Sequence, residues 1–250
     1  MHCWSIAKTD IGKRRPHNED FFIADDRLGL YVVADGVGGH AKGEIASQEA
    51  VEQIHGWVRA EYGTIQQFAA APTDESLQNL RRLLESAVQS ACYMVFGMAE
   101  LDPTHRGMST TISALLLAGP FGFIGQVGDS RVYRLRGGAV EQLTEDHTLI
   151  NYKLKHGLIS PEEAARAPGK NVITRAVGHR DYVEVDTMHV ETAPGDRYML
   201  CSDGLHGYLK DREIGVIMGK EPKTAAQEFI DLANHRGGRD NITVVLVGVG

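Results

Sequence analysis

The chain has 250 residues, of which 42% are hydrophobic and 24% charged, a balance that predicts one globular domain without disulfide cross-links. Its formal net charge of -7 argues against a nucleic-acid-binding protein. No apolar run is long enough to span a membrane, Met1-His2-Cys3-Trp4 does not open a signal peptide, and the three cysteines are widely spaced, so we expect a cytoplasmic protein with no membrane partner.

The first hundred residues are predicted to form short strands followed by two long helices. Apolar residues at helical spacing indicate a helix from about Glu44 to Tyr62. Gly63 to Pro72 is expected to be a break, after which Thr73 caps a helix that ends near Glu100. Two long helices in sequence are expected to pack antiparallel. The strands predicted before them are Cys3–Lys8, Phe21–Asp25 and the run from Leu30 that ends on Asp35.

The second half is predicted to be richer in strands. A meander of hairpins comes first, and residues 146 to 175 then form a polar, helical excursion in which Ser160 caps a helix opened by Pro161. The predicted strands are Thr110–Leu117, Phe121–Val127, Arg131–Leu135, Val183–Val190, Arg197–Cys201 and Ile242–Val249. Helices are predicted near Asp211–Met218 and Lys223–Asn234.

Asp35 follows a run of apolar residues and precedes a glycine-rich turn. The run, Leu30-Tyr31-Val32-Val33-Ala34, is typical of a buried strand. An acid at the end of a buried strand is costly unless another group offsets its charge, and a cation would do so. Other acids stand in comparable places at strand ends or turns: Asp203, Asp240, Asp129, Glu19 and Asp20.

Carboxylate oxygens alone are a ligand set that suits Mg²⁺ or Mn²⁺. Two such ions lower the pKa of a shared water and screen the charge of an approaching phosphate, which the guanidinium of Arg15 could also bind. Taken singly, an Asp-Gly pair is first a turn former, and Arg15 belongs to a basic cluster that could be a solvated face. The conjunction of several strand-end acids with one arginine favours a phosphate-processing metal site.

The glycines after Asp35 also match a dinucleotide-binding pattern, G-x-G-x-x-A, at residues 36 to 41. That pattern should open a helix leading to a second parallel strand. Here two long helices are predicted with no strand before about Thr110, which disfavours the dinucleotide interpretation.

Five segments resemble, in order and spacing, the motifs of the metal-dependent PPM (PP2C-type) serine/threonine protein phosphatases of bacterial type. The resemblance runs from about Thr9 to the C-terminus, nearly the whole chain. The segments are Gly12-x-x-Arg15-x-x-Asn18-Glu19-Asp20, Asp35-Gly36-Val37-Gly38-Gly39, Gly128-Asp129-Ser130-Arg131, Ser202-Asp203-Gly204 and Asp240-Asn241.

The resemblance implies an α+β fold, a four-layer α-β-β-α sandwich with two mainly antiparallel sheets flanked by helix pairs. It implies that residues 1–250 form a single domain, with a flap-like excursion at about 146–175. The implied activity is hydrolysis of phosphoserine and phosphothreonine in proteins by a hydroxide that bridges two Mn²⁺ or Mg²⁺ ions, without a phosphoenzyme.

The resemblance also implies roles for individual residues. Arg15 would bind the substrate phosphate. The implied metal ligands are Asp35 as the bridge, the Gly36 carbonyl, Asp203, Asp240, Glu19 and Asp20 through waters, and Asp129 for a third, weaker ion. Eukaryotic members carry a histidine as proposed general acid where this chain has Val37. His40 is therefore a candidate to protonate the leaving seryl oxygen, or else an exposed histidine that only touches substrate; His147 is expected to be structural.

The implied partners are phosphorylated proteins and a bacterial Ser/Thr kinase whose action the phosphatase opposes in signalling, and a monomer is expected. Two alternatives remain at this point. One is a non-catalytic regulator that binds phosphoproteins with the same fold. The other is a phosphatase acting on an anti-sigma-factor antagonist.

Overall fold

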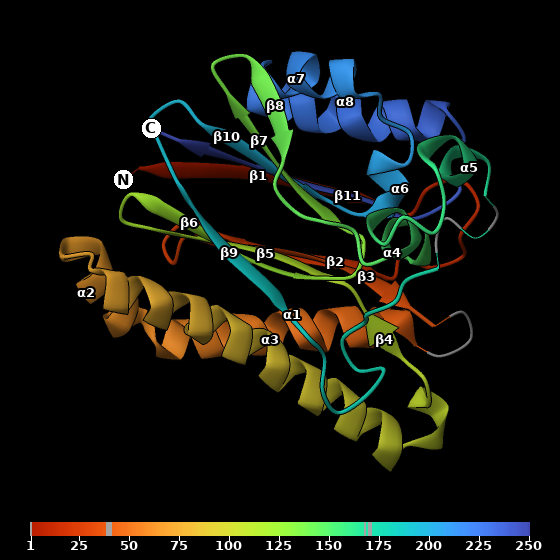
Figure 1. Cartoon of the computed structure of the whole chain (residues 1–250), viewed down its shortest axis with the longest axis horizontal. Coiled ribbons are helices and arrows are strands. Elements are labelled where there is room, and N and C mark those ends of the chain that lie inside the picture. The colour runs from red at the N-terminus through yellow and green to blue at the C-terminus, as the bar shows by residue number, and fades with distance from the viewer. Residues whose placement is uncertain (1, 39–41, 168, 170–171) are drawn as a thin grey trace.

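The computed structural model describes residues 2–38, 42–167, 169 and 172–250. Two β-sheets pack face to face, and helices cover the outer face of each (Figure 1). Alternating side chains of β3 (Leu30–Val37) explain this layering. Val32 and Ala34 face the helices, whereas Tyr31 and Val33 join the core between the sheets. The predicted four-layer sandwich is confirmed.

Within the described residues the sheets have five and six strands, and every adjacent pair is antiparallel. The first sheet has the order β1 (Cys3–Asp10), β11 (Ile242–Val249), β10 (Arg197–Cys201), β7 (Arg131–Arg136) and β8 (Ala139–Gln142). The second has the order β2 (Asp20–Asp25), β3, β5 (Ile112–Ala118), β6 (Phe121–Val127) and β9 (Asp186–Glu191), with β4 (Ser109–Thr110) paired to β3.

Helices α1 (Gly43–Ala60), α2 (Tyr62–Ala70) and α3 (Asp74–Leu101) cover the second sheet, and α7 (Asp211–Met218) and α8 (Pro222–His235) cover the first (Figure 1). The predicted cap at Thr73 is confirmed, because its side chain accepts a hydrogen bond from the Ser76 N–H. No helix formed by the described residues combines the length and the apolar character needed to cross a membrane.

Several sequence-based boundaries were wrong, and two short elements were missed. The predicted break at Gly63–Pro72 is mostly helix α2, which forms because Ile65 and Phe68 are buried on one face. β9 begins at Asp186 rather than Val183, since the Val183 N–H donates to the side chain of Gln89 on α3 (3.3 Å) instead of to a strand. The short elements β8 and α6 (Asp203–His206) were not predicted.

The excursion contains α4 (Leu149–Lys155) and α5 (Pro161–Arg166) and lies at the end of the molecule away from the chain termini (Figure 1). Its two ends are joined by backbone hydrogen bonds, from the Leu149 N–H to the Val172 oxygen (2.8 Å) and from the Thr174 N–H to the His147 oxygen (2.8 Å). The excursion therefore rises from a closed base beside the edge where several strands end.

Candidate active site

The strand ends bring the predicted acids to one edge of the sandwich. Asp20 opens β2 and stands directly opposite Asp35 of β3. Asp203 is the first residue of α6, just after β10 ends, and Asp240 lies two residues before β11. Because β10 and β11 are neighbours, these two acids lie near one another and near the first pair.

Two glycines allow the close backbone approaches that build this edge. A Cβ atom on Gly36 would overlap the carbonyl of Gly43, where α1 begins, so α1 can start against β3 only with glycine there. A Cβ atom on Gly204 would overlap the carbonyl oxygen of Asn241, and its absence draws α6 toward the start of β11. The glycines of these Asp-Gly pairs are therefore needed for close backbone packing as well as for the turns.

Asp20 is the most deeply buried of these acids, with 6% of its surface exposed. One carboxylate oxygen, Oδ2, accepts a hydrogen bond from the Ser202 hydroxyl at 2.7 Å, whereas Oδ1 is buried without a hydrogen-bond partner. Burial, reinforced by the charges of Asp203 and Asp240, raises the pKa of Asp20 to about 7. A buried carboxylate oxygen without a partner is costly, and a cation would satisfy it.

The pKa values of the neighbouring acids are raised in the same way. Burial raises the pKa of Asp35 well above its usual range, and the negative charges of Asp20 and Asp203 add to the effect. The pKa of Asp203 is raised by burial and then by Asp240. Such a cluster favours uptake of positive charge, and its oxygen-only chemistry fits a hard divalent cation.

Arg15 lies at the rim of the cluster. Its Nη2 atom donates to Oδ2 of Asp240 at 2.7 Å, and both side chains are partly exposed. Across the described ranges, no group of three or more His, Cys, Asp or Glu side chains is already arranged so that it could hold a metal ion. The ion pair between Arg15 and Asp240 is partly exposed, and such a pair contributes about 0 to 1 kcal/mol, so it can be broken at little cost.

Asn241 fixes the loop that presents Arg15. Its side-chain nitrogen donates to the carbonyl oxygens of Ile11 (3.0 Å) and His17 (2.9 Å), and its side-chain oxygen accepts from the Glu19 N–H (2.8 Å). The sequence marks Asn241 as part of a motif but gives it no role. Only the fold reveals the role, since the contacts join residues more than 200 positions apart.

The Gly128-Asp129-Ser130 turn between β6 and β7 adds another acid. Asp129 is 8% exposed, and burial together with the charge of Asp203 raises its pKa to about 7. The Nε2 atom of His206 donates to the Asp129 carbonyl oxygen at 2.9 Å. Glu19 is partly buried at the loop end, and burial raises its pKa. His40 lies outside the described residues.

Thr111 joins the Asp129 turn to Asp35, and sequence reasoning missed it. Its hydroxyl oxygen accepts from the Asp35 N–H (3.0 Å) and lies 2.8 Å from the Ser130 hydroxyl, while its own N–H donates to the Asp35 oxygen (2.9 Å). A single threonine thus holds the backbone of Asp35 and contacts the side chain next to Asp129, a second candidate ligand.

A cavity of about 630 Å³ opens beside the acids. Arg131 and Asp146 line it as an ion pair with two hydrogen bonds, at 2.8 and 2.6 Å. The excursion contributes Ile150 and Leu154 to its wall, so the space combines apolar and polar surfaces. Such a cavity can admit a side chain of a bound polypeptide.

Comparisons with known proteins agree with this geometry. Residues 13–241 match the family model described as protein phosphatase 2C. The chain is 38% identical over 247 residues to the serine/threonine phosphatase stp of Listeria innocua, covering 96% of this chain and 93% of that protein. The crystal structure of the Mycobacterium tuberculosis serine/threonine phosphatase PstP/Ppp superposes with a TM-score of 0.87 at 35% identity, covering 99% of this chain and 98% of that one.

A second solved structure is the catalytic domain of serine threonine protein phosphatase PstP in complex with two manganese ions. It is similar with a TM-score of 0.84 at 34% identity, and 99% of each chain is covered. The shared fold, the matched motifs and the full-length similarity lead to one conclusion. This chain belongs to the protein phosphatase 2C family of serine/threonine phosphatases.

Proposed function

We propose that this protein removes phosphate from phosphoserine and phosphothreonine in bacterial proteins, with two Mn²⁺ or Mg²⁺ ions held at the carboxylate edge. The observation that supports this most is the buried Asp20 oxygen without a partner, set among acids whose pKa values are raised by burial and by each other. An uncompensated cluster of this kind is expected where a cation belongs.

In this proposal Asp35, the Gly36 carbonyl, Asp203 and Asp240 would hold the ions, with Glu19 and Asp20 acting through bound waters. When bound, the ions supply a water of lowered pKa and offset charge on the phosphoryl group. Arg15, once released from Asp240, would bind the phosphate oxygens through a guanidinium that matches their geometry.

Two further residues are given roles in the proposed mechanism. His40 is our candidate for the proton donor to the leaving seryl or threonyl oxygen, since Val37 of β3 cannot donate a proton. Asp129 is proposed as a ligand for a third, weaker ion, which agrees with its burial and with the adjacent charge of Asp203.

The wider setting is also part of the proposal. Residues 1–250 would act as a single domain and a monomer, with the excursion at 146–175 as a flap over the cavity. A Ser/Thr kinase would phosphorylate the substrates in a signalling pathway. A cytoplasmic location is supported by the cysteines Cys3, Cys92 and Cys201, which are free thiols.

The test is hydrolysis of p-nitrophenyl phosphate and of a phosphothreonine peptide, with and without manganese. Asp35→Asn and Asp203→Asn should each abolish the manganese-dependent rate and weaken manganese binding in calorimetry. Asp231→Asn is the matched control, because Asp231 is exposed on α8 and does not line the cavity beside the acids. Full activity of either site variant in the presence of chelator would refute the two-ion proposal. Metal binding without turnover would instead favour a non-catalytic phosphoprotein binder.

A further inference from the structure

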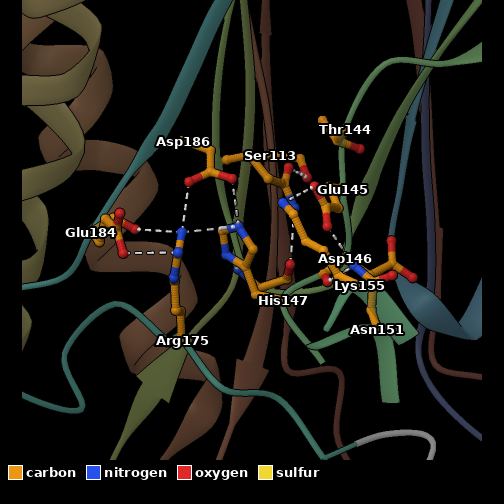
Figure 2. Close-up of polar contacts among 12 residues, drawn as sticks. Ser113, Thr144, Glu145, Asp146, His147, Asn151, Lys155, Arg175, Glu184 and Asp186 are labelled. Atoms are coloured by element: carbon orange, nitrogen blue, oxygen red, sulfur yellow. Dashed lines mark hydrogen bonds and ion pairs between the residues drawn. The ribbon is translucent and has the colours of Figure 1, made fainter. Parts of the chain in front are cut away.

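His147 lies where the excursion begins and joins three parts of the chain that are far apart in sequence. Its ring is buried, with 6% of the side chain exposed. Figure 2 shows the ring pointing toward Asp186 of β9 and Arg175 at the end of the excursion. The sequence predicted only a structural role for His147.

The contacts of the ring define its protonation state. Nδ1 lies 3.1 Å from the backbone nitrogen of Gly128, and since an amide N–H can only donate, Nδ1 is the acceptor. Nε2 therefore holds the proton and donates to Oδ2 of Asp186 at 3.1 Å, so Nη1 of Arg175, 3.2 Å from Nε2, contacts the ring without a hydrogen bond to it. Burial lowers the pKa of His147, and although Asp186 opposes this, the guanidinium of Arg175 adds to it, so the neutral ring is favoured.

The backbone of His147 binds the same turn. Its N–H donates to the Gly128 carbonyl oxygen at 2.9 Å, and its own carbonyl accepts from Thr174 at 2.8 Å. Gly128 is thus held through both its N–H and its oxygen by one residue. It has a φ of +97°, a conformation that glycine adopts readily, and the Gln126 side chain also donates to the Gly128 and Ser130 carbonyl oxygens, at 3.1 and 2.7 Å.

Asp186 and Arg175 hold the ring in this orientation. Arg175 donates through Nη1 to Oδ1 of Asp186 at 2.6 Å and pairs through Nη2 with Glu184 at 2.8 Å (Figure 2). Asp186 therefore accepts from His147 with one oxygen and from Arg175 with the other. The ring cannot turn its acceptor nitrogen away from Gly128 without losing the bond to Asp186.

We propose that His147 is a positioning residue, whose Nδ1 acceptor fixes the Gly128-Asp129-Ser130 turn and so sets the place of Asp129 beside Asp203 and of Ser130 beside Thr111. The proposal rests on the phosphatase function proposed above and deepens it. His147 touches neither substrate nor the reacting atoms. Its effect passes through the Gly128 N–H, the residue next to a candidate metal ligand, where such outer contacts usually affect activity or metal affinity about 10- to 100-fold.

Two amide substitutions separate the two ring nitrogens. The side-chain oxygen of His147→Asn can take the place of Nδ1 and still accept from Gly128, while the contact to Asp186 is lost. The longer amide of His147→Gln takes the place of Nε2 and can still donate to Asp186, but offers no acceptor to Gly128. We expect His147→Asn to keep kcat within about 3-fold of wild type and His147→Gln to lower kcat about 10-fold or more.

A purely structural role predicts the opposite order, because asparagine loses more volume and also the Asp186 contact. The second readout is independent of activity: amide hydrogen exchange of Gly128 in ¹⁵N-labelled, metal-free protein. Exchange should be faster than wild type in His147→Gln and nearly unchanged in His147→Asn. His156→Gln, at an exposed histidine of the same excursion, is the control for both readouts.

Two variants of Asp186 test the same proposal even if the His147 variants do not fold. Asp186 has 49% of its side chain exposed, so its substitution should not unfold the protein. Asp186→Asn keeps one oxygen for the Nε2 proton but turns an amide nitrogen toward Arg175, so it should lower kcat less than Asp186→Ala. Asp186→Ala removes the acceptor that orients the His147 ring. It should lower kcat about 3-fold or more and speed the hydrogen exchange of the Gly128 amide.

Equal loss in His147→Asn and His147→Gln, or wild-type kcat in both His147→Gln and Asp186→Ala, would overturn the positioning role. An inactive wild-type protein would instead refute the proposed phosphatase function, and the exchange measurements would still decide whether His147 holds the turn.

Discussion

Replacing Asp129 with asparagine should stabilise the metal-free protein while impairing its metal-dependent activity. Asp129 is 8% exposed and close to the charge of Asp203, and its pKa is raised to about 7. In the unfolded chain the same carboxyl ionises near pH 3.9. Between these two values the folded state keeps a proton that the unfolded state has released, so stability falls as the pH rises from about 4 to about 7.

The size of the effect follows from this difference of about three pKa units. At about 1.36 kcal/mol per unit, ionised Asp129 lowers the free energy of unfolding by about 4 kcal/mol above pH 7. Asparagine has nearly the same shape and no charge, so it removes this penalty. We expect Asp129→Asn to raise the free energy of unfolding at pH 8, up to that ceiling, and to give little gain at pH 4.

Urea unfolding in chelator at pH 4, 6 and 8, followed by circular dichroism, measures this difference. Asp196→Asn is the matched control of opposite sign. Burial raises the pKa of Asp196, but the hydrogen bonds from Arg136 (2.7 and 2.6 Å) and from the Ala193 N–H (2.9 Å), with the arginine charges, together lower it, so loss of its charge should destabilise. If Asp129→Asn is no more stable than wild type at pH 8, or gains equally at pH 4, the reasoning about charge repulsion in the cluster fails.

Three further changes test other parts of the structure. Burial lowers the pKa of His206 to about 4, so the ring is neutral in the folded protein at neutral pH. Its contribution to stability is complete above about pH 6.5 and is lost as the pH falls toward 4. His206→Gln should therefore make the urea midpoint less dependent on pH between about 6.5 and 4. Thr73→Ala removes the cap shared with Ser76 and should lower the free energy of unfolding by about 1 kcal/mol with phosphatase activity unchanged, and a loss of activity would contradict its remote position. Gly36→Ala should abolish activity, because the added Cβ overlaps the Gly43 carbonyl; an active, normally folded variant would refute the close approach.

The fold was largely predictable because its strands and helices have clear periodicity and turn signals. The strand Ile242–Val249 and the helix Asp211–Met218 have the predicted bounds. Helix α2 was missed because Gly63 and Pro72 suggest a break, yet Gly63 lies in its first turn and Pro72 beyond its end. Burial of Phe68 against the second sheet decided the structure there, and local propensity cannot report such a contact.

The acids of the site were predictable because each stands at a strand end or turn. The residues that hold them were not, because their hydrogen bonds join distant segments through the backbone. Thr111, Ser202 and Asn241 are ordinary polar residues in the sequence, and only the register of β2, β3 and β11 gives them partners. The histidine of the excursion was likewise recognised without its link to Gly128.

The position of β11 has a consequence for synthesis of the protein on the ribosome. This strand lies between β1 and β10, pairing with β1 over eight residue pairs, and Asp240 and Asn241 come just before it. A growing chain that has passed residue 230 still lacks both the strand on which β1 docks and the asparagine that fixes the Arg15 loop. A nascent chain is therefore expected to be inert toward phosphoproteins until residues 240–249 leave the exit tunnel, and to present the unpaired β1 to chaperones until then.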